Sequence, residues 1–268
     1  MRRIRLITRR TITAVTGALA LLYAGLALLN LGSPPADIMT AQQNPPRTIA
    51  ILGATGTIGD GLLKAALSDS TIETIHVITR RPSPRIEAGV ETGRVVMTLH
   101  YDYLDYSALD ELLGSVDAVF WAIGLSAVGI EESAYREIHR DFPREFLAAW
   151  SKGGAQGDRS FHYVSGGGAN PDSRMMWARE KANAESTLAK MGQRRGVTVI
   201  SYRPAFVMPT EVEATFGKRV MHAIFAPIGL SVQAEQIGRA MLFTSARSRA
   251  LKNGTVLENG DILSLSKS

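Results

Sequence analysis

A glycine-rich turn between a strand-like run and a helix-like run constrains this chain more than any other feature. The apolar residues 49–52, Ile-Ala-Ile-Leu, lead into glycines spaced three apart. In such a turn the first glycine permits a tight turn, the second lets the backbone approach a pyrophosphate, and the third lets the helix pack on the strand. The helix start offers free N–H groups to the phosphates. We therefore expect a dinucleotide site rather than a purely structural turn, formed by Gly53, Thr55, Gly56, Thr57, Ile58 and Gly59.

The pattern after Thr48 predicts an α/β fold. Short, often β-branched apolar runs alternate with amphipathic stretches of helix length, which is typical of a doubly wound parallel sheet (a Rossmann fold) with helices on both faces. We expect strands at Thr48–Leu52, Thr74–Thr79, Val95–His100, Ala118–Ala122, Ser160–Val164 and Thr198–Ser201. We expect helices at Ile58–Ser68, Ser107–Leu113, Glu132–Ser151, Met175–Met191 and Ala234–Ser245. Residues 48–268 are taken as one domain.

The end of the second expected strand indicates the type of dinucleotide. An NAD site normally places Asp or Glu there, to accept hydrogen bonds from the ribose 2′-hydroxyl. This chain has Thr79 followed by Arg80 and Arg81. A guanidinium group binds a 2′-phosphate through charge-assisted hydrogen bonds, so the sequence favours NADP over NAD. The alternative is a pair of solvated loop arginines.

With the glycines placed, the chain resembles the atypical branch of the short-chain dehydrogenase/reductase superfamily. The sequence Gly-Ala-Thr-Gly-Thr-Ile-Gly at residues 53–59 carries the resemblance, which runs from about residue 48 to residue 245. It implies that Asp102 holds the adenine and that Ala122 and Gly124 lie beside the nicotinamide ribose. It also implies that Ser165 is the serine that orients the substrate carbonyl.

The resemblance fails at the expected catalytic tyrosine. The family carries Tyr-x-x-x-Lys on the helix after the serine, and this chain has Trp177 where the tyrosine belongs and Lys181 where the lysine belongs. An indole N–H only donates a hydrogen bond, so Trp177 cannot replace the tyrosine as general acid or base. Lys181 still matches the residue that holds the ribose. Tyr163 and Tyr202 are possible substitutes, although neither has the family's spacing from the lysine.

Other chemistries have weaker support. The chain has no cysteine, so disulfides and Cys-ligated metals are excluded. Its five histidines show no metal-ligand spacing, so we expect no metal site. A serine hydrolase is disfavoured because the residues around Ser165 lack the first glycine of a nucleophile elbow.

The amino terminus predicts a membrane contact. Residues 1–10 contain five arginines and no acid, and these arginines account for the whole formal net charge of +5. Because the remainder is formally neutral, we expect no nucleic-acid partner. Residues 11–31 carry no charge and would span roughly 31 Å as a helix, about the thickness of a bilayer core. We interpret residues 1–31 as a single hydrophobic helix that is either an anchor or an export signal; the anchor is favoured because no good cleavage site follows.

Residues 32–47 contain four prolines and no apolar periodicity, which is typical of a stiff linker. The side of the membrane stays open: the arginines favour a cytoplasmic amino terminus and an exported domain, whereas NADP pools are cytosolic. Translation from Met39 would instead give a cytoplasmic protein.

For function, two hypotheses remain, an NADP-dependent oxidoreductase acting on a small carbonyl or polyol, and a non-catalytic NADP(H) sensor or interaction module.

Overall fold

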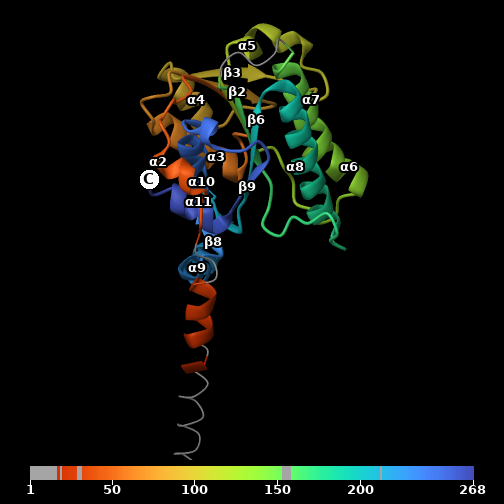
Figure 1. The fold of residues 1–268 in the computed structure, drawn as a ribbon. Coiled ribbons are helices and arrows are strands. Elements are labelled where there is room, and N and C mark those ends of the chain that lie inside the picture. Colours follow the sequence, from red (N-terminus) through yellow and green to blue (C-terminus); the bar gives the residue numbers. More distant parts are fainter. Residues whose placement is uncertain (1–16, 19, 29–31, 153–157, 212) are drawn as a thin grey trace, which may run out of the picture.

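A parallel seven-stranded sheet forms the centre of the molecule (Figure 1). The computed structural model describes residues 17–18, 20–28, 32–152, 158–211 and 213–268. The strand order is β3-β2-β1-β4-β5-β6-β9, so the order reverses between β1 and β4, where such folds place a ligand. The strands are β1 (Thr48–Leu52), β2 (Thr74–Thr79), β3 (Val95–Leu99), β4 (Ala118–Trp121), β5 (Ser160–Val164), β6 (Thr198–Arg203) and β9 (Thr255–Glu258). The predicted doubly wound α/β fold is confirmed.

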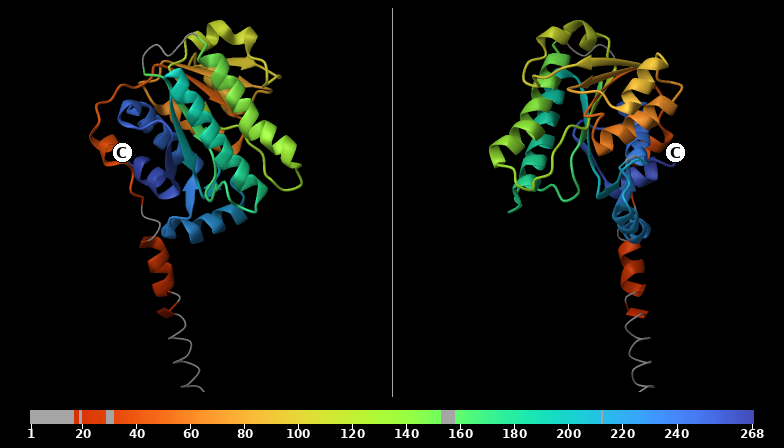
Figure 2. Two further views of the ribbon diagram at one scale, coloured as in Figure 1. Left: turned by 45° about the vertical axis from the view of Figure 1, so that its right-hand side comes forward. Right: turned by 180° about the vertical axis from the view of Figure 1, so that it is seen from behind.

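Helices cover both faces of the sheet (Figure 2). One face carries α3 (Thr57–Ser68), α4 (Pro84–Glu91), α10 (Ala234–Ser245) and α11 (Asn259–Leu265). The other carries α5 (Asp110–Gly114), α6 (Glu132–Arg136), the π-helical turn η2 (Glu137–Asp141), α7 (Phe142–Trp150) and α8 (Met176–Arg195). The elements α4, β9 and α11 were not predicted from the sequence, nor was the small sheet of β7 (Phe206–Met208) and β8 (Ser231–Gln233) with its neighbouring helix α9 (Phe216–Phe225).

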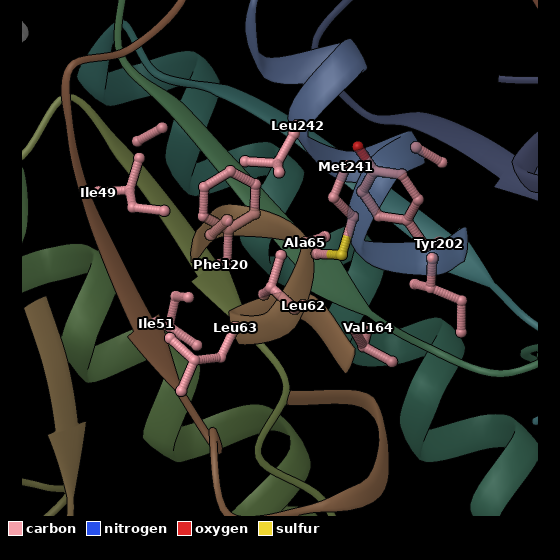
Figure 3. Packing of buried hydrophobic residues seen from close by; sticks show 14 of the residues in the cluster. Ile49, Ile51, Leu62, Leu63, Ala65, Phe120, Val164, Tyr202, Met241 and Leu242 are labelled. Carbon is pink, nitrogen blue, oxygen red and sulfur yellow. The ribbon is translucent and has the colours of Figure 1, made fainter. Parts of the chain in front are cut away.

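Both faces of the central strands are buried, as the apolar composition of β1 predicts. Successive strand residues point to opposite faces, so Ile49 and Ile51 join the cluster under α3 and α10, whereas Ala50 and Leu52 join the cluster under α7 and α8. Figure 3 shows the first cluster, in which strand residues such as Phe120 pack against the helices. This core aligns the carboxyl ends of β1, β2, β4, β5 and β6 along one edge.

The prediction of one long apolar helix ahead of the domain is not confirmed. Residues 17–18 and 20–28 are helical, but residues 11–16, 19 and 29–31 of the expected segment, and the arginines of residues 1–10, lie outside the described residues. Within the part of the chain that the structure describes, no helix is both long and apolar enough to cross a membrane.

The proline-rich stretch 32–47, interpreted as a linker, packs against the domain. It contains a short helix, α2 (Ala36–Thr40), whose Ile38 is fully buried in the core under α3 and α10. The backbone N–H of Asn44 donates to the carbonyl of Ala246 at 2.6 Å. An isoleucine in the core and backbone pairing hold this stretch in place, so it is part of the globular body rather than a free spacer.

Candidate dinucleotide-binding site

The glycine loop has the geometry that the sequence predicts. Gly53 has a φ of +88°, which favours glycine, and a Cβ there would lie 2.5 Å from the carbonyl carbon of Ala122. A Cβ on Gly59 would lie 2.0 Å from the Gly53 oxygen, so only glycine lets α3 approach β1 this closely. Gly56 is exposed and precedes the first turn of α3, whose initial N–H groups include those of Thr57 and Ile58. The loop therefore fits a pyrophosphate cradle at a helix amino terminus.

A pocket of about 370 Å³ adjoins this loop, and sequence reasoning missed most of its residues. Thr55 lines it together with Asp60, Arg85 and Glu213. Arg85 Nε donates to Asp60 Oδ1 at 2.7 Å, and the Thr57 hydroxyl donates to Glu213 Oε2 at 2.7 Å. The segment after β7 thus crosses the start of α3. Nothing local in the sequence marked these residues, because Arg85 lies on an unpredicted helix and Glu213 is distant in the chain.

The residues expected to bind the adenosine lie where β2 and β3 end. The parallel register pairs Leu52 of β1 with Ile78 of β2, so Gly53 and Arg80 leave the sheet close together. Both Arg80 and Arg81 are exposed. The guanidinium carbon of Arg80 lies 5.7 Å from the centroid of the Tyr103 ring. Asp102 is also exposed, and its Oδ1 accepts a hydrogen bond from the Leu104 N–H at 2.9 Å. The structure therefore leaves two cations and one carboxylate accessible at this end.

The nicotinamide end gathers residues from three strand ends. Ala122 follows β4 and its N–H donates to the Leu52 carbonyl at 2.8 Å, and the Ser165 N–H donates to the Tyr202 carbonyl at 2.8 Å. Ser165 is only 7% exposed, and its hydroxyl oxygen has no hydrogen-bond partner among the described residues. Such an orphaned hydroxyl is available for a ligand.

Lys181 contacts the backbone of the residue that precedes this serine. It extends from α8, is 7% exposed, and donates from Nζ to the Val164 carbonyl at 2.9 Å. Burial lowers the pKa of Lys181 to about 7, and the nearby Glu185 carboxylate offsets part of this effect. The structure thus brings Lys181, a lysine able to exchange a proton near neutral pH, to the carboxyl end of the strand that leads into Ser165.

Trp177 lies against the loop that follows Ser165. Cβ atoms built on Gly166 and Gly168 would each lie 3.7 Å from its ring, so the half-buried indole rests against the turn that follows Ser165. Trp177 therefore presents an apolar ring to the turn that follows Ser165.

Tyr163 and Tyr202, the two tyrosines considered as substitutes for the family's catalytic tyrosine, both already have hydrogen-bond partners. Tyr163 is fully buried, and its hydroxyl donates to the His139 carbonyl at 2.8 Å. That carbonyl lacks its helical partner because the residue four positions later is Pro143, which has no N–H. Tyr202 is also fully buried and pairs with His162 at 2.8 Å. Burial raises the pKa of both phenols, so neither serves as a general acid near neutral pH.

His139 is a site residue that the sequence did not reveal. It lies in the π-helical turn, and a Cβ on Gly124 would come within 2.8 Å of its Cε1 atom, which explains the glycine. Its Nε2 lies 3.2 Å from the backbone nitrogen of Leu125. Burial, followed by the charge of Lys181, lowers the pKa of His139 to about 3, so the imidazole is neutral. His139 therefore holds the loop after β4 in place.

These features define a Rossmann-type fold with a glycine loop at the point where the strand order reverses. A family model described as the NAD dependent epimerase/dehydratase family matches residues 49–236, and the chain belongs to that family. The match supports a nicotinamide dinucleotide as the cofactor, and the resemblance to the atypical short-chain dehydrogenases is confirmed.

Similar proteins include Protein FMP52, mitochondrial, of Chaetomium globosum, which is 26% identical over 81% of this chain and 96% of that protein. The hybrid PKS-NRPS synthetase gkaA of Penicillium citrinum is 24% identical over 66% of this chain, but the match spans only 5% of the synthetase. Among solved structures, a 3-oxoacyl-[acyl-carrier protein] reductase from Brucella melitensis in complex with NAD shares the fold. Its TM-score is 0.62 at 15% identity, over 85% of this chain and 99% of the reductase.

Proposed function

We propose that this protein is an NADP(H)-dependent oxidoreductase that interconverts a small carbonyl compound and its alcohol. The observation that carries the proposal is the burial of both Ser165 and Lys181 at the carboxyl end of β5. A lysine buried with a lowered pKa is costly to the fold, and the unpartnered Ser165 hydroxyl adds a second cost. Costs of this kind are concentrated at functional sites.

Reduction of a carbonyl adds a hydride to carbon and a proton to oxygen, and a bound reduced nicotinamide supplies the hydride. The Ser165 hydroxyl donates to the carbonyl oxygen and orients it. The Lys181 ammonium, with its pKa of about 7, is the acid that we assign to protonation of the nascent alkoxide, and it is then recharged from solvent. In this scheme Lys181 takes over the acid role of the missing tyrosine.

The substrate has an apolar part. Leu125 and Val128 after β4, and Met175 before α8, are exposed apolar side chains that border the same edge of the sheet as Trp177. A polar sugar would gain little binding free energy from these side chains, whereas an aliphatic or aromatic carbonyl compound would bury their apolar surface.

The preference for NADP rests on Arg80 and Arg81, and titration of cofactor fluorescence tests it. An Arg80→Ala/Arg81→Ala double variant is expected to weaken NADPH binding at least about tenfold, the effect of losing one to two charge-assisted hydrogen bonds, while NADH binding stays within about twofold. Arg194→Ala, an exposed arginine at the end of α8, is the matched control. Equal affinities of the native chain for NADPH and NADH would refute the role of the two arginines.

A non-catalytic NADP(H) sensor is the second candidate, and Trp177 favours it. A Trp177→Tyr variant and the native chain should be assayed with NADPH and a panel of aliphatic and aromatic aldehydes and ketones. Turnover by the native protein that is lost in Ser165→Ala supports the oxidoreductase. Turnover that appears only in Trp177→Tyr would show that the native protein is a binding module.

We also propose that residues 11–31 attach the chain to a membrane, since this stretch is uncharged and follows the arginine cluster. Flotation of the full chain with lipid vesicles tests the attachment. Recovery of the chain only in the soluble fraction would refute it.

A further inference from the structure

Helix α9 exposes most of its apolar side chains. Its apolar residues Phe216, Val220, Met221 and Ile224 are exposed, Phe216 to 82%, and α9 contributes no buried residue. One of its polar residues faces the protein: His222 Nδ1 lies 2.7 Å from the Ser231 hydroxyl. A surface helix normally buries its apolar stripe, so the outward face of α9 is built to meet something apolar.

The helix at residues 20–28 continues this apolar surface. Leu21, Leu22 and Leu28 are exposed, Leu21 to 77%. The Tyr23 hydroxyl donates to the Ile224 carbonyl at 2.6 Å, which joins this helix to the carboxyl end of α9. The contact places α9 next to the uncharged segment that follows the arginine-rich decapeptide.

Both helices lie at the same end of the molecule as the active-site edge. The views of Figures 1 and 2 agree that α9 and the amino-terminal helix extend from one end of the domain, whereas α5 lies at the opposite end. The segment between β7 and α9 also contacts the cofactor loop, through the Thr57 and Glu213 hydrogen bond. Hence α9 has a defined position relative to the site.

The size and charge of the face indicate what covers it. A ten-residue helix is about 15 Å long and about 10 Å wide, so the face is far smaller than the about 800 Å² that each partner contributes to a stable protein interface. Arg219 is exposed on α9, and five arginines lie ahead of the uncharged segment. Apolar side chains flanked by cations are the composition of a helix that lies in the interface of an anionic membrane.

We propose that α9 lies in the headgroup region of a lipid bilayer, with Phe216, Val220, Met221 and Ile224 inserted, and holds the active-site edge against the membrane surface. The proposal rests on the membrane attachment proposed for residues 11–31 and is independent of the redox chemistry. It implies that the substrate is reached from the membrane phase.

The absence of cysteine from the chain gives a direct test. A Val220→Cys variant of the full chain carries one environment-sensitive fluorophore on the outward face of α9, and Glu111→Cys on α5 carries it at the opposite end. Vesicles of phosphatidylcholine and phosphatidylglycerol bear nitroxides on the acyl chains close to the headgroups. Because an interfacial helix sits roughly 5–10 Å into the headgroup boundary, we expect about twofold or greater quenching of the label at position 220 and none at position 111.

Further measurements separate the possible outcomes. Adding Phe216→Ser and Ile224→Ser to the Val220→Cys variant should remove the quenching while the chain still floats with the vesicles. A chain that floats with neither label quenched, or with both quenched equally, would overturn the role of α9. Protection of the label without lipid, together with a doubled molecular mass, would show that a second copy covers the face and would also overturn it. Cofactor binding measured on the same samples reports on the proposed function separately.

Discussion

Replacing Lys181 by methionine should make the protein more stable while removing its activity. Lys181 is buried and its pKa is lowered from 10.5 to about 7. This shift corresponds to about 4 to 5 kcal/mol of unfavourable free energy at a pH below 7, where the side chain is charged in both the folded and the unfolded chain. Methionine keeps most of the aliphatic stem but loses the hydrogen bond to Val164, which costs about 1 to 3 kcal/mol.

The net effect at pH about 6 is a gain of about 2 kcal/mol, or roughly 4 to 8 °C in Tm for a domain of this size. The gain depends on pH in a defined direction. Between pH about 7 and about 10.5 the unfolded native chain binds more protons than the folded chain, so the native protein becomes more stable as pH rises. The advantage of the Lys181→Met variant should therefore shrink across this window.

Urea or thermal unfolding followed by circular dichroism at pH about 6 and about 10 measures both effects. Lys190→Met, at an exposed position on the same helix, is the control and should change little at either pH. A Lys181→Met variant that is less stable than the native chain by the same amount at both pH values would refute the reasoning, because the ammonium would then be a net stabilising group.

Three further predictions concern individual contacts. Gly56→Trp should abolish NADPH binding with little change in Tm, because this exposed position borders the phosphate cradle; binding retained in a fluorescence titration would contradict the assignment. Tyr163→Phe should destabilise the protein by about 1 to 3 kcal/mol by leaving the His139 carbonyl unpaired, yet keep NADPH affinity unchanged; a selective loss of turnover would show a catalytic tyrosine instead. Ile38→Ala should cost about 2 to 4 kcal/mol in urea unfolding, and a value near zero would restore the linker interpretation.

The local part of the site was predictable because its chemistry resides in contiguous residues. The turn at Gly53, the close approach at Gly59 and the start of α3 all follow from backbone constraints within a few positions. The helix through residues 132–151 was also predicted, but its π-helical turn and the place of His139 under Gly124 were not. They depend on Pro143, on Tyr163 from β5 and on a loop after β4, which meet only in the folded chain.

The sequence by itself determined the α/β class and the glycine loop at the start of α3. These depend on period, spacing and residue type, which are properties of neighbouring positions. Only the tertiary structure decided that Tyr163 and Tyr202 are unavailable, that Lys181 titrates near neutral pH and that α9 turns its apolar side outward. Burial and hydrogen-bond partners set all three, and both are created by contacts between residues that are far apart in the chain.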